Sequence, residues 1–184
     1  MLVRHATTDA VRRAAFPLDE RLDAGGVAAA EALAGRLGRG DALCGPSLRA
    51  RATAAACGLD ARVEPALDEC DFGAWRGRTL ADVHASDEAA AVAWMTDPAA
   101  RPHGGESLEG FSERVRGWLA GQVGLDGRAV AITHGGVIKA AVVAALGAPL
   151  EAFWRVDAAP LAVTELHARD GRWTVACVNA PVVA

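Results

Sequence analysis

Tyrosine is absent from the 184-residue sequence, and it has only two methionines and a single lysine. Alanine is abundant instead, which indicates a genomic composition bias and no particular function. No apolar run is long enough to span a membrane. The first residues, MLVRHATT, hold three apolar residues before a charge, too few for a signal peptide. We therefore expect no membrane partner.

Cysteine occurs at only four positions, and no two of them form a CxxC motif. Such wide spacing argues against a zinc site, and the lack of a signal peptide argues against a disulfide framework. The pattern predicts reduced thiols and a cytoplasmic location, with no metal. The four residues are Cys44, Cys57, Cys70 and Cys177.

The charge balance is mildly acidic, with a net charge of −4 and a pI of about 5.7. No basic excess points to nucleic acid or to an anionic membrane surface. An active site for an anionic substrate would therefore need positive charge that is concentrated locally.

Alternating strand and helix patterns predict an α/β fold, a three-layer sandwich with a mostly parallel central sheet and helices on both faces. The chain length suits a single domain over residues 1–184, with a small helical lid inserted at about 70–105. The predicted strands are 2–4, 41–44, 61–63, 128–133, 161–167 and 173–178, the last two paired through a turn at 169–171. The predicted helices are 27–37, opened by Asp23, and 47–57, 108–119 and 137–146.

Four basic side chains follow the predicted strands, at the points where three of those strands end. Arg4 and His5 follow the first strand, Arg49 lies just past the second, and His134 follows the fourth. A lone histidine or arginine in such a place is usually an ordinary loop residue. Because open α/β sheets bind ligands outside the carboxyl ends of their strands, the four together predict a site for a phosphate dianion.

Five segments, in this order along the chain, resemble motifs of the histidine phosphatase (phosphoglycerate mutase-like) superfamily. The segment Leu2-Val3-Arg4-His5-Ala6-Thr7-Thr8 is similar to its opening LxRHGxT signature. The others are 22–26, the segment PSLRARATA at 46–54, the segment LDECDFGAWRG at 67–77, and ITHGG at 132–136. Weaker matches lie at 104–107 and 160–166, so the resemblance extends over most of the chain.

The resemblance implies that His5 is a nucleophile that forms a phosphohistidine, which water then hydrolyses. It also implies that Arg4, Arg49 and His134 bind the phosphate, with His134 taking part in catalysis. His134 would have to be protonated, a form that a nearby phosphate dianion favours. Glu69 would protonate the leaving alkoxide and then activate water. No cofactor is implied, and the partner is a small phosphorylated substrate.

Glu69 lies in an acidic stretch, so its role has alternatives. Glu64, Asp68 and Asp71 surround it, and the stretch could simply be a solvated loop. If the match is shifted by a residue or two, Asp68 or Asp71 is the acid instead.

Four positions depart from the family pattern. Ala6 replaces a glycine, which requires that this residue avoid a positive φ. Val11 stands where an asparagine often helps to bind phosphate, so one donor is missing. Gly45 replaces a serine, and Arg76 stands where an acidic residue is common.

Other candidate residues receive no catalytic role from the sequence. The pattern places Lys139 on the helix after His134, with no role, and Trp75 and Trp94 in the core of the lid. The remaining histidines, at 84, 103 and 167, are expected to be surface or structural residues.

The short segment after Glu69 has the FGxW pattern of the phosphatase branch and lacks the basic run that is typical of mutases. We therefore expect a metal-independent phosphomonoesterase, whose GxW segment most resembles those of α-ribazole phosphatases and of general sugar-phosphate phosphatases. One alternative is phosphoryl transfer of the phosphoglycerate mutase type. Another is a non-catalytic module that binds a phosphorylated ligand or a protein, and a homodimer is left open.

Overall fold

The computed structural model describes residues 1–182, so the last two residues of the predicted domain lie outside the described part. The strands are β1 (Leu2–Arg4), β2 (Asp41–Cys44), β3 (Arg62–Val63), β4 (Ala129–Thr133), β5 (Val163–Arg169) and β6 (Arg172–Ala180). The helices are α1 (Asp9–Arg12), α2 (Ala24–Glu31), α3 (Leu48–Ala56), α4 (Leu80–Ser86), α5 (Glu88–Thr96), α6 (Leu108–Gly121) and α7 (Gly135–Leu146). Three 3-10 turns are η1 (Pro65–Leu67), η2 (Gly73–Trp75) and η3 (Leu150–Arg155).

The six strands form one sheet in the order β3-β2-β4-β1-β5-β6. The first four of these strands are parallel, and β5 and β6 are antiparallel to their neighbours. The β5–β6 hairpin turns at Asp170 and Gly171, which both have positive φ, as a two-residue hairpin turn requires. The mostly parallel sheet and the hairpin are confirmed.

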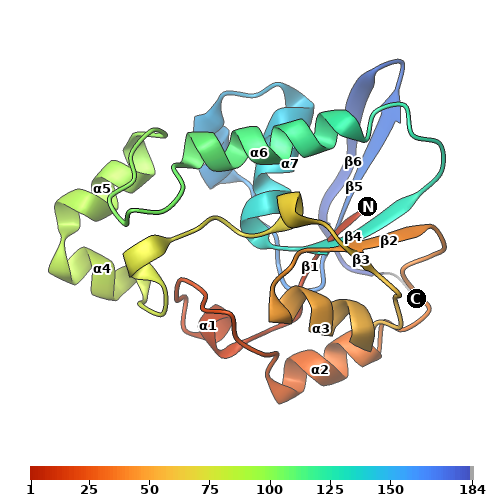
Figure 1. Ribbon diagram of the computed structural model, residues 1–184, viewed down its shortest axis with the longest axis horizontal. Helices are drawn as coiled ribbons and strands as arrows, with labels where there is room; N and C mark the ends of the chain where they lie inside the picture. The colour runs from red at the N-terminus through yellow and green to blue at the C-terminus, as the bar shows by residue number, and fades with distance from the viewer. Residues whose placement is uncertain (183–184) are drawn as a thin grey trace.

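Helices cover both faces of the sheet (Figure 1), which confirms the three-layer sandwich. Successive strand residues point to opposite faces, so Leu2 packs in the core under α6 and α7 while Val3 packs in the core under α2 and α3. The same alternation separates Leu43 from Cys44. The buried faces of the strands therefore hold both helix layers in place.

The helix predicted at 27–37 is wrong in its second half. Asp23 does cap α2, accepting a hydrogen bond from the Gly26 amide, but the helix ends at Glu31. Beyond it the chain makes tighter bonds between residues three apart, such as that from the Leu33 amide to the Ala30 carbonyl. Gly35, with φ of +75°, then turns the chain away from the helix.

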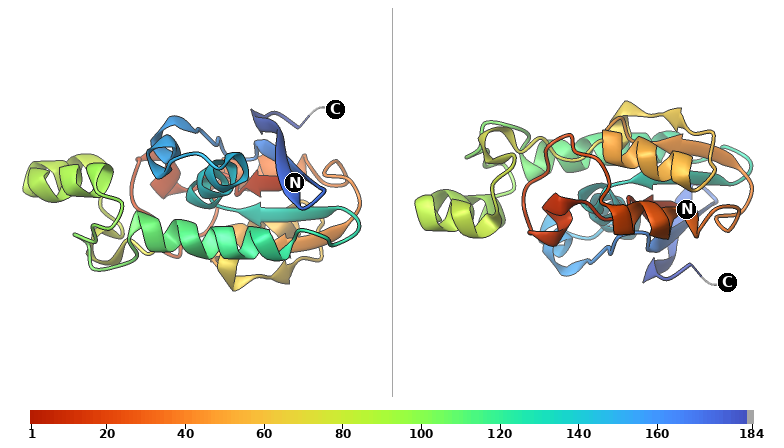
Figure 2. Two further views of the ribbon diagram at one scale, coloured as in Figure 1. Left: turned by 90° about the horizontal axis from the view of Figure 1, so that it is seen from above. Right: turned by 90° about the horizontal axis from the view of Figure 1, so that it is seen from below.

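The segment predicted to be a lid, at about 70–105, holds α4 and α5, at the end of the molecule opposite the N-terminus (Figures 1 and 2). Trp75 and Trp94 are buried in its core, as predicted. His103 packs between their rings, with centroid distances of 4.9 and 4.7 Å, and is a structural residue. Of the helices described, none is both long and apolar enough to span a membrane. The four cysteines are free thiols.

Candidate active site

Strand register brings the two catalytic histidine candidates together. In the parallel pair β1–β4, Arg4 lies opposite Thr133, so the residues that follow, His5 and His134, leave the sheet side by side. The His5 amide donates a hydrogen bond of 2.8 Å to the Thr133 carbonyl. As a result, the two imidazole rings lie 5.2 Å apart between centroids.

His5 is buried and carries its proton on one defined nitrogen. Nδ1 lies 2.7 Å from the carbonyl oxygen of Ala6, and because a carbonyl can only accept, Nδ1 must donate. Burial, together with the charges of Arg49 and Arg4, lowers the pKa of His5 to about 3. The ring is therefore neutral near pH 7, with a lone pair on Nε2.

Two arginines lie close enough to His5 for their charges to act on it. Arg49, in the first turn of α3, donates from Nε to His5 Nε2 at 3.3 Å and from Nη1 to the Leu18 carbonyl at 2.9 Å. Arg4 donates from Nη1 to the Ala158 carbonyl at 2.7 Å, while its buried Nε has no partner. A buried, unsatisfied guanidinium donor is costly unless an acceptor such as a phosphate oxygen approaches it.

His134 is completely buried at the N-terminus of α7. Its Nε2 lies 3.4 Å from the Ser47 hydroxyl and 3.6 Å from an Asp68 carboxylate oxygen, and its Nδ1 has no partner. Burial, and next the charge of Arg49, lowers the pKa of His134 well below its ordinary value. The protein groups alone therefore keep His134 neutral, and the expected protonated form requires the charge of a nearby phosphate dianion.

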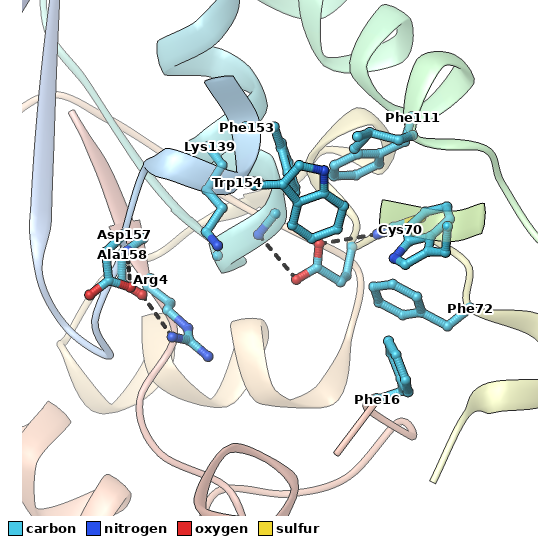
Figure 3. Close-up of a pocket in the computed structure, with 15 residues that line it drawn as sticks. Arg4, Phe16, Cys70, Phe72, Phe111, Lys139, Phe153, Trp154, Asp157 and Ala158 are labelled. Atoms are coloured by element: carbon cyan, nitrogen blue, oxygen red, sulfur yellow. Dashed lines mark hydrogen bonds between the residues drawn. The ribbon is translucent and has the colours of Figure 1, made fainter. Parts of the chain in front are cut away.

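The three acidic candidates take different positions. Glu69 accepts hydrogen bonds from the amides of Gly136 at 3.3 Å and Cys70 at 3.1 Å (Figure 3). Asp68 faces His134, and burial raises its pKa. Asp71 is exposed and accepts a hydrogen bond from the Gly73 amide. Asp68 thus contacts His134 itself, whereas Glu69 contacts the backbone two residues after His134.

Arg114, on α6, holds this acidic loop in place through hydrogen bonds to its carbonyls. No motif in the sequence pointed to this residue. Its Nη1 donates to the carbonyls of Ala66 at 2.9 Å and Asp68 at 3.1 Å, and its Nη2 donates to that of Glu69 at 3.4 Å. The same guanidinium pairs with Glu106 at 3.0 and 2.8 Å. The only available signal was the weak motif around Glu106, and that motif does not indicate that Glu106 pairs with Arg114.

Two hollows meet at Glu69. One, of about 230 Å³, lies between the lid and α7, and we call it the aromatic pocket. Six aromatic side chains line it, together with Arg4 and with Lys139 on α7 (Figure 3). The aromatic residues are Phe16, Phe72, Trp94, Phe111, Phe153 and Trp154. The other hollow, of about 470 Å³, is lined by Ser47, Arg49 and Asp68 among others.

Residues 1–181 match the family described as the histidine phosphatase superfamily (branch 1). The chain belongs to this superfamily. It is 37% identical over 160 residues to a bifunctional protein of Mycobacterium tuberculosis, covering 83% of this chain and 44% of that one. An adenosylcobalamin/alpha-ribazole phosphatase of Escherichia coli is 32% identical over 104 residues, 54% of this chain and 51% of that protein. The chain thus spans about half the length of these curated relatives.

A solved structure resembles this histidine phosphatase superfamily member over nearly all of both chains. It is a mycobacterial glucosyl-3-phosphoglycerate phosphatase in complex with VO3, with 31% identity and a TM-score of 0.83. The similarity covers 97% of each chain. The superfamily resemblance and the expected fold are therefore confirmed.

The departures from the superfamily pattern have local explanations. Ala6 does not have a positive φ, and its amide donates to the Thr53 hydroxyl at 3.0 Å, so the methyl group is tolerated. A Cβ on Gly45 would lie 2.7 Å from the Leu67 carbonyl oxygen and 3.1 Å from His134 Nε2, which explains the glycine. Val11 lies on α1 and lines neither hollow at Glu69, whereas the exposed Arg76 lines the larger one.

The buried neutral His5 makes folding stability depend on pH. Its pKa of about 3 in the folded protein lies below the ordinary value of 6.5, so the unfolded chain binds the proton more tightly. The stability contribution is complete above pH 6.5 and is lost as the pH falls toward 3. Lowering the pH from 7.5 to 5 should therefore reduce the free energy of unfolding by about 2 kcal/mol through this group.

The measurement is urea unfolding of the wild type and of His5→Gln at both pH values. From pH 7.5 to pH 5, the free energy of unfolding of the variant should fall by about 2 kcal/mol less than that of the wild type. Equal losses in both proteins would show that His5 is not held neutral by burial.

Proposed function

We propose that this protein hydrolyses phosphomonoesters of small metabolites, with His5 Nε2 as the nucleophile. The observation that carries the proposal is the Nε2 lone pair, fixed by the Nδ1 hydrogen bond and placed 3.3 Å from the Arg49 guanidinium. A neutral imidazole with a defined tautomer can attack phosphorus near pH 7 without first losing a proton.

Arg4, Arg49 and His134 would bind the phosphoryl oxygens. In phosphoryl transfer the charge spreads over the three equatorial oxygens, and catalysis depends mostly on groups that stabilise it. Arg49 would exchange its hydrogen bond to His5 for one to the phosphate, and the unpaired Arg4 Nε would gain an acceptor. The N-terminus of α7 adds backbone amides with a favourable dipole.

Glu69 would protonate the leaving oxygen and later accept a proton from water. Glu69 lines both the aromatic pocket and the hollow that contains Ser47 and Asp68, so a leaving group in the aromatic pocket would lie against its carboxylate. Arg114 would position Glu69, because its guanidinium donates hydrogen bonds to the backbone carbonyls of Glu69, Asp68 and Ala66. Asp68, beside His134, is the second candidate for the acid.

The names of relatives suggest two substrate classes. One is a sugar-linked phosphoglycerate, as in glucosyl-3-phosphoglycerate phosphatase, and the other is α-ribazole phosphate. The VO3 complex of the former supports a site that binds a phosphate-like oxyanion. Hydrolysis is favoured over mutase chemistry because the lid segment of this chain, with its FGAW stretch, lacks the basic run expected of a mutase.

Replacing the nucleophile tests the proposal directly. With p-nitrophenyl phosphate and no added metal, the wild type should release inorganic phosphate and should carry acid-labile phosphate after rapid quenching. His5→Ala should reduce turnover by at least about 1000-fold and trap none. A wild type that neither turns over nor traps phosphate would refute hydrolysis. Phosphate exchange between the positions of phosphoglycerate that is faster than release would indicate a mutase.

Paired variants distinguish the two candidate acids. Glu69→Gln should slow hydrolysis most for esters with poor leaving groups, because they need a proton on the departing oxygen. Asp68→Asn should slow good and poor leaving groups to the same extent, since its carboxylate contacts His134. A series of substituted phenyl phosphates measures both effects. If the leaving-group dependence changes in Asp68→Asn and not in Glu69→Gln, the acid is Asp68.

A further inference from the structure

Lys139 lies on the helix after His134, as expected, but it also lines a pocket that the sequence pattern does not reveal. It lies on α7 and lines the aromatic pocket together with Gly135 and Gly136. Residues three and four apart on a helix share one face, which explains why these three line the same wall. Lys139 is also the only lysine in the sequence, although the chain has 19 basic residues.

The Lys139 amine has no anionic partner in the part of the chain that the structure describes. It forms neither a hydrogen bond nor an ion pair there, and its Nζ lies 5.5 Å from the centre of the Phe153 ring. Asp157, the other acid besides Glu69 in this pocket, accepts hydrogen bonds from the Ala158 amide and from Asn179. Figure 3 shows the lysine amine on the same side of the pocket as Arg4, away from Phe16 and Phe72.

The pocket thus contains two cations with different environments. Arg4 is hydrogen-bonded to the Ala158 carbonyl and adjoins His5, so its remaining donor suits the phosphate. Lys139 follows Gly135 by four residues, which at 1.5 Å per residue is about 6 Å along the axis of α7. The backbone of Lys139 therefore lies about one helical turn beyond the end of α7 where the phosphate would bind, and its amine is available to a second anion in the same pocket.

We infer that the substrate is a phosphomonoester whose leaving group carries a carboxylate, bound by Lys139, a few bonds from the ester oxygen. This inference rests on the proposed function and narrows it. Phe72 and Trp154 offer flat apolar surfaces for a ring in the same leaving group. A leaving group without an anion would desolvate the half-buried amine and give it no partner, which costs affinity. Lys139 therefore selects phosphorylated carboxylic acids over phosphorylated nucleosides.

Matched synthetic esters test this selection. Phenyl phosphate is compared with its 3-carboxy and 4-carboxy derivatives, which differ from it by one carboxylate. The measured quantity is the kcat/KM of the better carboxylated ester divided by that of phenyl phosphate. In Lys139→Met this ratio should fall about tenfold or more, mainly through KM, because a hydrogen bond between charged groups is lost. Lys139→Arg keeps the cation and should retain most of the ratio.

Arg169→Met provides the matched control. It also removes one positive charge, but its site lies at the exposed turn of the β5–β6 hairpin, and the ratio should not change. An unchanged ratio in Lys139→Met, with phenyl phosphate still hydrolysed by the wild type, would overturn the inference and leave the proposed function intact. A wild type that hydrolyses none of the three esters would overturn both.

Discussion

The hydrogen bond from His5 Nδ1 to the Ala6 carbonyl determines which nitrogen of a buried imidazole faces the phosphate site. The rest of the site depends on that tautomer. Burial and the charges of two arginines keep the ring neutral. Arg49 donates a hydrogen bond from Nε to the lone pair on His5 Nε2. Those arginines would hold the phosphate against the same lone pair. The two arginines that, after burial, depress the pKa of the proposed nucleophile are thus also the groups that would bind its target.

Much of the scaffold was predictable because it follows from local patterns. Apolar strand segments that end at His5 and His134, and a capped helix after Ser47, specify the layers and the edge where ligands bind. The end of α2 was not predictable from apolar spacing. Gly35 turns the chain through a positive φ, and the spacing of apolar residues carries no information about that conformation. The motif residues converge because β1 and β4 are adjacent in the sheet, a tertiary fact that the family resemblance anticipated.

The residues that the sequence did not reveal act across long separations. Arg114 holds carbonyls more than 40 residues away, and nothing in its own helix predicts that contact. Lys139 was correctly placed on the helix after His134, yet its pocket exists only because the lid and η3 bring aromatic side chains against that helix. The lid and η3 therefore supply much of the aromatic lining of this pocket, while the sheet edge holds the groups proposed for phosphoryl transfer.

A crystal structure with orthovanadate tests the central claim most directly, because vanadate adopts the five-coordinate geometry of a phosphoryl group in transfer. The account predicts vanadium within bonding distance of His5 Nε2, with Arg4, Arg49 and His134 contacting its equatorial oxygens and Glu69 beside the apical oxygen. Vanadate bound by the arginines without a bond to His5 Nε2, or bonded to another side chain, would contradict it.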